Sequence, residues 1–324
     1  MNKIVVFRKA DPAFHSIENV FNSLMPYLNA RKVVLPYPSR GFLKRIKNIF
    51  NIKRQNPNLL HISGHDHYLL WFPFKNALLT IHDIESLKRK SGLSRLIFKW
   101  LWFDLPIHNA SLVTTISEFS AAEINSLGNY STPIKVIHNP LSLPLQFKPK
   151  PFDSFKPKIL HIGTKSNKNL FRLIEAVDGL PCKLIILGDG CAEIHTKLKR
   201  HKIDYIIRNG LSNAEMQVLY SQIDLLAFVS TYEGFGLPII EAQAIGRPVL
   251  TSNLASMPEV AGEGAHFVDP YSIEDIRKGL NELISDAVLR NKLIEKGREN
   301  IKRFDPKKIA AQYQELYDQV ANEA

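Results

Sequence analysis

The sequence predicts an α/β protein made of two doubly wound domains that follow one another along the chain. Short apolar runs alternate with stretches of helical periodicity, and this alternation occurs twice within the 324 residues. Strands that alternate with helices pair in parallel, and the helices then cover both faces of the sheet. Between the two series lie residues 140–157, a proline-rich segment that disfavours regular structure and is typical of a linker.

In the first half, five apolar runs are expected to be buried strands. They are Ile4–Phe7, Lys32–Leu35, Leu59–Ile62, Ala77–Ile81 and Leu112–Ile116. A helix is expected after the first run, with Ser16 as its cap, because apolar residues recur at steps of three and four between Ile17 and Leu28.

In the second half the alternation restarts. The expected strands are Lys158–Ile162, Lys183–Leu187, Tyr205–Ile207, Asp224–Phe228 and Pro248–Thr251. The expected helices are Asn169–Val177, Asn213–Ser221, Leu237–Ile245 and Ile273–Arg303. A final helix, Lys307–Val320, begins after Asp305-Pro306, when the second domain is already complete.

The composition is that of an ordinary globular protein, with 45% hydrophobic and 23% charged residues. The apolar run at the N-terminus, Met1–Phe7, is too short for a signal peptide, and no run approaches the ~20 apolar residues of a membrane span. We therefore expect a cytoplasmic protein. Cys182 and Cys191 belong to no metal-binding or redox motif and are expected to be plain thiols.

The charge is unevenly distributed. Lys and Arg number 42 against 31 Asp and Glu, and no acidic residue occurs between Glu18 and Asp66. Within this span, residues 40–54 predict a basic amphipathic helix. Its apolar stripe is Phe42, Leu43, Ile46, Ile49 and Phe50, and Lys44, Arg45 and Lys47 lie off the stripe.

A second basic and aromatic segment covers residues 88–103. Such faces suit an anionic membrane surface, which would place the protein peripherally on the inner face of the plasma membrane. A helix that packs its apolar stripe on its own domain and exposes its basic face to solvent explains this charge pattern equally well. No nucleic-acid-binding motif accompanies the charge, so we expect no nucleic-acid partner.

The most informative motif is Ser230–Ala242, which places two carboxylates around the start of a helix. Pro238 suits the first helical turn, so the amides of Gly234, Phe235, Gly236 and Leu237 are expected at the helix N-terminus, where they favour an anion. Glu233 and Glu241 can bracket that anion and accept hydrogen bonds from hydroxyl groups. The arrangement fits a nucleotide sugar. Alternatively, Glu241 only solvates an ordinary βα unit.

This motif resembles the donor site of glycosyltransferase family 4, the retaining sugar transferases of the GT-B fold. Similar segments are Leu160–Leu170, Ile186–Gly190, Pro258–Val260 and Val268–Pro270, with looser matches at Thr80–Asp83, Ile116–Ser120 and Val136–Pro140. The resemblance implies two Rossmann-like domains that face each other across a cleft. Residues 1–148 would form the acceptor-side domain and residues 149–304 the nucleotide-sugar donor domain, with the helix in 305–324 packed back on the first domain.

The resemblance also implies roles for individual residues. Lys168 would bind the donor diphosphate with the backbone amides of Gly163 and Thr164. Glu241 would bind the ribose hydroxyls and Glu233 a hydroxyl of the donor sugar. His82 would contact the donor sugar or its phosphate across the cleft.

Two departures from the family pattern leave roles open. Many relatives carry an arginine at the position of Thr164, so either Lys165 replaces it or the second charge is absent. The first βα loop has no glycine before Gly41. Arg8, Lys9 or His15 would act on the phosphate there, or the loop serves the acceptor.

A metal site is suggested by the histidines and carboxylate between His61 and His67, but no distant ligand completes it. GT-B enzymes do not generally hold the diphosphate with a metal. We therefore expect no metal and no cofactor.

The resemblance implies a metal-independent retaining glycosyltransferase. It would move a hexose from a nucleotide-diphosphate sugar to a saccharide or polyprenyl-linked acceptor in bacterial surface polysaccharide synthesis, such as lipopolysaccharide O-antigen, capsule or exopolysaccharide. Two alternatives stay open. One is a sugar-nucleotide epimerase of the same fold, and the other is a non-catalytic basic protein that binds membrane or nucleic acid.

Overall fold

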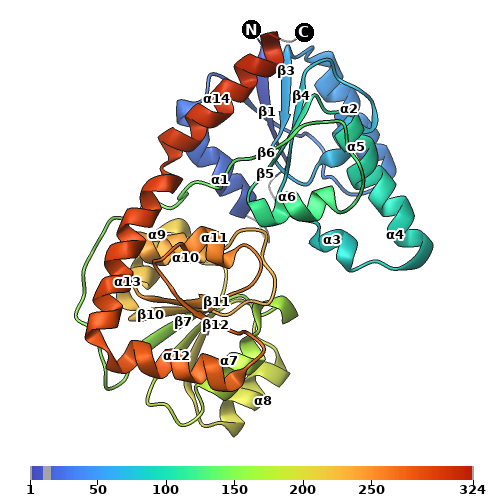
Figure 1. The fold of residues 1–324 in the computed structure, drawn as a ribbon. Helices are drawn as coiled ribbons and strands as arrows, with labels where there is room; N and C mark the ends of the chain where they lie inside the picture. The colour runs from blue at the N-terminus through green and yellow to red at the C-terminus, as the bar shows by residue number, and fades with distance from the viewer. Residues whose placement is uncertain (1, 10–15, 323–324) are drawn as a thin grey trace. The chain divides into compact units, whose positions relative to one another are not determined.

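The computed structural model describes residues 2–9 and 16–322, and the chain divides into two compact units (Figure 1). The first unit is Met1–Ser142 with Asp305–Ala324, and the second is Leu143–Phe304. The division falls six residues before the expected limit at 148 because the linker packs on the second unit. The Phe147 ring lies against Gly246, and the Lys148 N–H donates to the Ile245 carbonyl at 3.3 Å.

The first unit contains a six-stranded sheet in which every neighbouring pair is parallel. Its order is β2 (Arg31–Val34), β1 (Lys3–Phe7), β3 (Leu59–Ile62), β4 (Ala77–Ile81), β5 (Leu112–Thr115) and β6 (Ile134–Val136). The four central strands are buried along their whole length, as expected of a parallel sheet covered on both faces.

Helices cover both faces of this sheet (Figure 1). They are α1 (Ser16–Leu24), α2 (Phe42–Arg54), α3 (Glu85–Lys88), α4 (Gly92–Lys99), α5 (Leu105–His108), α6 (Glu118–Asn125) and α14 (Pro306–Asn322), with the shorter turns η1 (Met25–Tyr27), η2 (His67–Trp71) and the π-helical η3 (Trp100–Asp104). The side chains of Ser16 and Ile17 lie outside the described part, so the expected cap at Ser16 is not described.

The last helix, α14, packs on the first unit beside α1 and against β3 and β4. A buried polar network fastens it there. The hydroxyl of Tyr317 lies 2.7 Å from His61 Nδ1, and His61 Nε2 lies 2.8 Å from the hydroxyl of Thr80. Burial lowers the pKa of His61 to about 3, so this histidine is neutral and structural.

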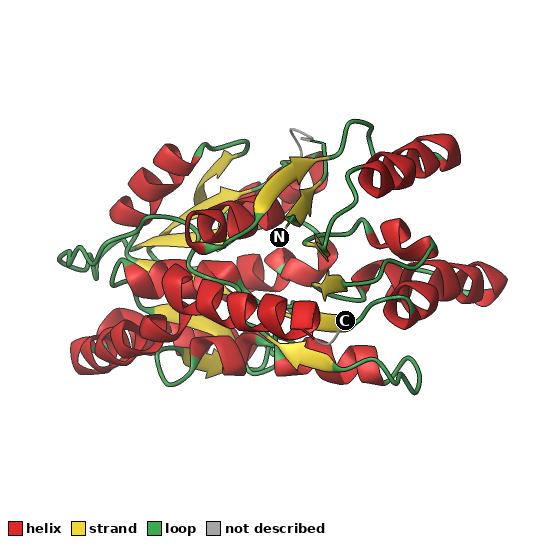
Figure 2. Cartoon of the chain, turned by 90° about the horizontal axis from the view of Figure 1, so that it is seen from above, coloured by secondary structure: helices red, strands yellow, loops and turns green. Residues whose placement is uncertain are grey.

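The second unit repeats the architecture with its own parallel sheet. The order is β12 (His266–Val268), β11 (Val249–Ser252), β10 (Leu225–Phe228), β7 (Lys158–Ile162), β8 (Lys183–Leu187) and β9 (Asp204–Arg208). Its helices are α7 (Leu170–Ala176), α8 (Ala192–Arg200), α9 (Asn213–Gln222), α10 (Leu237–Ala244), α11 (Met257–Ala261), α12 (Ile273–Ser285) and α13 (Ala287–Asn300), with turns η4 (Ser166–Lys168) and η5 (Ile301–Phe304). Figure 2 distinguishes the strands, in yellow, from the helices, in red.

The expected fold class of two doubly wound sheets is confirmed, one expected helix was wrong, and some short elements were not predicted. The single helix predicted over Ile273–Arg303 breaks at Asp286, whose carboxylate accepts the Leu289 N–H and caps the start of α13. Two edge strands of three residues each, β6 and β12, were not predicted as strands.

The order of the second sheet creates a switch point. From β7 the chain adds β8 and β9 on one side, then crosses over to add β10, β11 and β12 on the other. The segments that follow β7 and β10 therefore leave the carboxyl edge of the sheet side by side and in opposite directions. Ligands of doubly wound sheets bind at such a point.

The stripe predicted on residues 40–54 is split between the interior and the surface. Ile49 is buried in the core and Ile46 packs against it, whereas Phe42, Leu43 and Phe50 are exposed. Within residues 2–9 and 16–322, no helix combines the length and the apolar character needed to cross a bilayer.

Candidate active site

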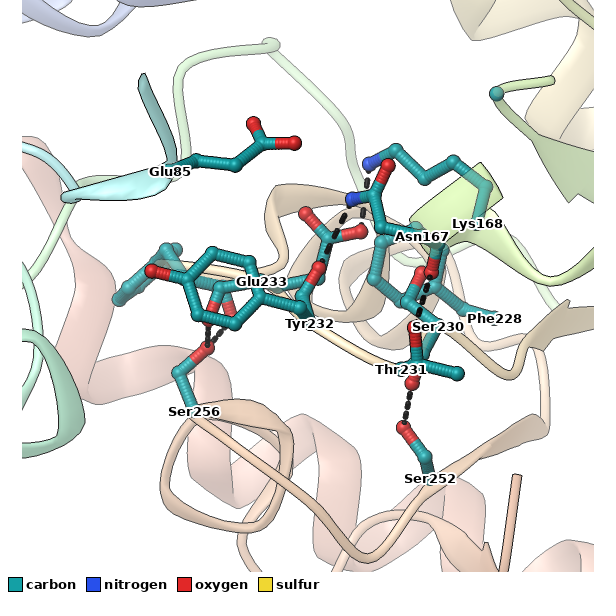
Figure 3. Close-up of polar contacts among 12 residues, drawn as sticks. Glu85, Asn167, Lys168, Phe228, Ser230, Thr231, Tyr232, Glu233, Ser252 and Ser256 are labelled. Atoms are coloured by element: carbon teal, nitrogen blue, oxygen red, sulfur yellow. Dashed lines mark hydrogen bonds and ion pairs between the residues drawn. The ribbon is translucent and has the colours of Figure 1, made fainter. Parts of the chain in front are cut away.

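The two segments at the switch point are joined by hydrogen bonds that begin at Asn167 (Figure 3). The Asn167 carbonyl accepts the N–H of Thr231 at 2.8 Å, and its side-chain amide donates to the carbonyl of Tyr232 at 3.0 Å. Two residues further on, the buried amide of Asn169 donates to the carbonyls of Val229 and Pro270. The segments after β7 and β10 therefore form one structure.

Two buried polar atoms of these segments, Asn167 Oδ1 and Ser230 Oγ, have no hydrogen-bond partner among the described residues. Buried polar atoms normally have one, so a native structure with such atoms calls for an explanation, such as an ordered water or an ion. Their position at the switch point is consistent with a ligand site.

Lys168 and Glu233 meet in this structure. Lys168 Nζ lies 2.6 Å from Glu233 Oε1 and 5.2 Å from the centre of the Phe228 ring (Figure 3). Both side chains are partly exposed, at 21% and 13%. An ammonium group and a carboxylate thus lie together just beyond the carboxyl edge of the sheet.

Gly163 makes the close approach of Lys168 possible. Its φ of +98° is a backbone conformation that side chains of other residues rarely adopt, and a Cβ there would lie 2.6 Å from Lys168 Cγ. The Gly163 N–H, however, donates to the Leu187 carbonyl at 2.7 Å. This amide is therefore engaged within the sheet, and its expected contribution to a phosphate site stays a prediction.

Thr164 packs beside the same loop. A Cβ on Gly188 would lie 2.9 Å from the methyl group of Thr164, so this side chain faces the end of β8. It supplies no charge in place of the family's arginine. The neighbouring Lys165 precedes the turn η4 and is exposed.

The residues Gly234, Phe235, Gly236 and Leu237 form the turn into α10. Ser256 fixes this turn, because its hydroxyl lies 3.0 Å from the carbonyl of Glu233 and 2.7 Å from that of Phe235 (Figure 3). Phe235 is buried, with its ring edge-on to Phe304. Leu237 begins α10, and Pro238 occupies its first turn as predicted. The helix N-terminus carries partial positive charge.

Glu241 lies on α10 and is 7% exposed, deeper than a residue that only solvates a helix. Its Oε2 accepts a hydrogen bond of 2.6 Å from the hydroxyl of Tyr220, which is fully buried on α9. Burial raises the pKa of Glu241 to about 7, and the hydrogen bond from Tyr220 opposes that rise. The carboxyl is thus held in one orientation near its titration point.

His82 belongs to the first unit, where it follows β4 and is buried. Its Nε2 lies 2.9 Å from the carbonyl of Ser63, and burial lowers its pKa to about 4. The imidazole is therefore neutral at pH 7. Its expected contact with a donor stays a prediction.

The first βα loop of the first unit is only partly described. Arg8 pairs with Glu18, with Nη2 3.0 Å from Oε2, and Lys9 is exposed. His15 lies outside the described residues. Arg8, Glu18, His65 and Asp66 line a small hollow at the switch point between β1 and β3. This places charged groups where the family pattern has glycine.

The histidines between 61 and 67 do not gather into a metal site. His61 is engaged with Tyr317 and Thr80, and His67 Nδ1 lies 2.7 Å from the carbonyl of Trp102. Over residues 2–9 and 16–322, no group of three or more His, Cys, Asp or Glu side chains is arranged to hold a metal ion.

Sequence reasoning missed Asn167, Tyr220 and Ser256 as members of this site. Asn167 lies next to Lys168, and its place in the first βα loop was the available signal. Tyr220 and Ser256 reach the site from α9 and from the turn before α11, and no motif marks them.

Comparison with known proteins agrees with this geometry. Residues 144–300 match the family described as Glycosyl transferases group 1. The chain is 27% identical over 257 residues to the O-antigen chain mannosyltransferase B of Escherichia coli, which covers 71% of this chain and 67% of that protein.

Two solved structures share the fold over essentially the whole chain. Sucrose-phosphate synthase from Thermosynechococcus elongatus superposes with a TM-score of 0.79 at 18% identity, covering 100% of both chains. HepE from Anabaena, crystallised with UDP and glucose, superposes with a TM-score of 0.78 at 18% identity, covering 98% of this chain and 100% of that one.

The fold is therefore GT-B, and the expected family resemblance is confirmed. The second unit matches the group 1 glycosyltransferases, and the chain is similar to glycosyltransferases over most of its length.

Substitution of Gly163 tests the packing of the first loop. Gly163→Ala is expected to lower the free energy of unfolding by about 2–3 kcal/mol, because the positive φ is strained and the new Cβ displaces Lys168. Gly179→Ala is the matched control, since Gly179 has a φ of +75° and a Cβ there would meet no atom within 4 Å. It should cost about 1 kcal/mol. Equal losses in urea unfolding would contradict a clash with Lys168.

Proposed function

We propose that this protein is a retaining glycosyltransferase that moves a hexose from a nucleotide-diphosphate sugar to a saccharide or polyprenyl-linked acceptor. The observation that carries the proposal is the meeting of Lys168 and Glu233 at the switch point, beside the turn into α10. The O-antigen mannosyltransferase relative and the UDP and glucose in HepE support the donor class. Bacterial surface polysaccharide synthesis is the setting that the first of these relatives suggests.

Transfer from a nucleotide sugar leaves growing negative charge on the departing diphosphate, and a site that stabilises this charge accelerates the reaction. Lys168 supplies a point charge on a flexible stem, and the N-terminus of α10 supplies partial positive charge. In this structure Lys168 pairs with Glu233. A bound donor would draw the ammonium toward phosphate and leave Glu233 to accept a hydroxyl of the sugar.

The remaining roles follow from a donor whose diphosphate lies at Lys168 and whose sugar lies at Glu233. Glu241 binds the ribose hydroxyls from its buried position on α10. The amides of Gly234, Phe235, Gly236 and Leu237 face the diphosphate, with Thr164 beside it. His82, neutral at pH 7, contacts the donor sugar from the first unit and donates or accepts a hydrogen bond without adding charge.

Separate substitutions of the two glutamates test these roles. Glu241→Gln should weaken binding of the nucleoside diphosphate about tenfold or more, because hydrogen bonds to a charged group are worth about 1.5–3 kcal/mol. Glu233→Gln should leave that binding within a few fold and lower kcat by about 100-fold or more. Glu295→Gln, on the exposed surface of α13, is the control. Calorimetry measures binding, and acceptor-dependent nucleotide release measures turnover.

Full activity in both glutamate variants would contradict the roles proposed for Glu233 and Glu241. Nucleotide release that does not depend on an acceptor would favour the epimerase alternative.

We propose that the enzyme needs neither a metal ion nor a cofactor for this reaction. Lys168 and the helix N-terminus supply the positive charge that a divalent ion supplies in other transferases. Initial rates should therefore be unchanged by EDTA. A complete loss of activity that magnesium restores would contradict the proposal.

We also propose that the protein works in the cytoplasm and binds the inner face of an anionic membrane through residues 40–54, without nucleic acid. The exposed apolar side chains of α2, Phe42, Leu43 and Phe50, support this contact. A second exposed apolar face is formed by Leu93, Leu96 and Ile97 of α4 and by Trp100 of η3.

Aromatic rings connect the two helices into one surface. Phe42 stacks on Trp71, Trp71 meets Trp102 edge-on, and Trp102 stacks on Phe98 of α4. Arg45 lies over the Trp102 ring at 4.5 Å and donates to the carbonyl of Ser39, so its charge is partly committed to this packing. Lys44 and Lys47 are the better probes of attraction to an anionic surface.

Vesicle sedimentation tests the surface. The protein should sediment with vesicles of phosphatidylcholine and phosphatidylglycerol but not with phosphatidylcholine alone, and salt should release it because surface attraction decays over ~8 Å at physiological salt. Replacing Lys44 and Lys47 with Glu should reduce binding at least tenfold, since each basic residue contributes about 1 kcal/mol. Replacing Lys199 and Arg200 of α8 with Glu is the matched control. Equal sedimentation of both variants would contradict this surface.

A further inference from the structure

Tyr220 is a buried residue of the second unit. Fold stability alone does not explain why its hydroxyl is bonded to a carboxylate. It lies near the end of α9 with no exposed surface, and its hydroxyl reaches across to α10. A buried tyrosine needs a hydrogen-bond partner for that hydroxyl, and a backbone carbonyl would serve. Here the partner is the carboxylate of Glu241, at 2.6 Å.

The hydrogen bond leaves the carboxylate asymmetric. Oε2 accepts a hydrogen bond from the Tyr220 hydroxyl. Over the described residues, no other side chain or amide donates to this carboxyl group. Oε1 and the free lone pairs therefore remain for a ligand. A carboxylate with one oxygen fixed presents the other in a defined direction before any ligand arrives, and such preorganisation lowers the entropy lost on binding.

We propose that Tyr220 is a positioning residue of the donor site, whose hydroxyl holds Glu241 Oε2 and so directs Oε1 at the ribose hydroxyls of the nucleotide. The inference rests on the proposed binding of ribose by Glu241. Tyr220 itself touches no substrate in this scheme.

The same hydrogen bond acts on the charge of Glu241. The pKa of Glu241 is about 7 because burial disfavours the carboxylate, while donation from Tyr220 favours it. The elements packed on α10 are α11, α13, β10, β11 and η5. Among their described residues, no charged group shifts the pKa of Glu241. Tyr220 is thus the polar group that favours the ionised form of Glu241, whereas burial disfavours it.

Removal of the hydroxyl has a predictable direction. Tyr220→Phe keeps the ring in the core and deletes the donor, so the pKa of Glu241 should rise further. At pH 7 a larger fraction of Glu241 is then protonated and cannot accept two hydroxyl hydrogen bonds. Affinity should fall at neutral pH and recover as the pH increases.

The experiment is calorimetric titration of UDP, or of the nucleoside diphosphate that stabilises the protein most, between pH 6.5 and 9 in about half-unit steps. Tyr220→Phe should weaken binding about tenfold at pH 7, the loss expected for one hydrogen bond to a charged group, and should move the midpoint of the affinity profile to higher pH. Because the titration of the ligand is common to all variants, differences between profiles report the protein.

Three further variants complete the design. Glu241→Gln should bind weakly with no midpoint in this range, and adding Tyr220→Phe to it should cause no further loss, because the pair acts as a unit. Tyr205→Phe is the matched control, since its hydroxyl bonds His195 at 2.9 Å elsewhere in the same unit. It should leave both affinity and midpoint unchanged.

The outcomes separate the inference from the proposed function. If Glu241→Gln binds as tightly as the parent, the ribose role of Glu241 fails and the role of Tyr220 fails with it. If Glu241→Gln is weak while Tyr220→Phe keeps the parental affinity and midpoint, only the positioning role is overturned. A Tyr220→Phe variant that is less stable but has the parental midpoint also overturns it, because a merely structural hydroxyl would do the same.

Discussion

The site depends on one set of contacts, the hydrogen bonds that join residues 167–169 to the segment after β10. Asn167 and Asn169 contribute both backbone and side-chain groups to it, and the Asn169 amide is buried. A buried amide that lost these partners would carry an unsatisfied polar group, so the two segments cannot separate without a cost of about 1–3 kcal/mol for each lost partner. Lys168, between the two asparagines, is therefore held within reach of Glu233 by its neighbours rather than by its own charge.

The parallel sheet explains why such contacts are possible there. Because β7 and β10 are adjacent but the chain leaves them in opposite directions, no βα crossover covers the space beyond their carboxyl ends. The glycines on either side act within this space, Gly163 by letting Lys168 lie over the loop and Gly234 and Gly236 by forming the turn into α10. The sheet supplies the position, and the loops supply the chemistry.

The strands and the motif around Glu233 could be predicted because both depend on local sequence. Buried parallel strands appear as apolar runs, and Pro238 marks the start of α10 by its own covalent geometry. The strands β6 and β12 escaped because three residues give too short a pattern to be recognised. The break at Asp286 was not predicted because the helical periodicity continues through it. The helix is interrupted by this one residue, whose backbone is extended and whose carboxylate caps α13.

What sequence reasoning could not supply about individual residues has a different cause, which is their dependence on distant parts of the chain. Sequence reasoning gave the Gly163 amide to a ligand, but β8 lies close enough to take it. It placed Ile49 on the apolar stripe of residues 40–54 and left open what covers that stripe, and the core of the first unit covers Ile49. Glu241 was expected on the basis of its spacing, and its spacing says nothing of Tyr220, which arrives from another helix.

The buried carboxyl group of Glu241 lowers the stability of the folded protein at neutral pH. A carboxyl whose pKa rises from 4.5 to about 7 on folding binds a proton more tightly in the folded than in the unfolded state, so stability falls as the pH increases from about 4.5 to 7. The shift corresponds to about 3 kcal/mol, a sizeable part of the stability of a domain. A glutamine at this position would remove that cost and could still accept the hydrogen bond from Tyr220. The retention of a buried carboxylate, with a buried phenol directed at it, therefore argues that the charge serves a ligand rather than the fold.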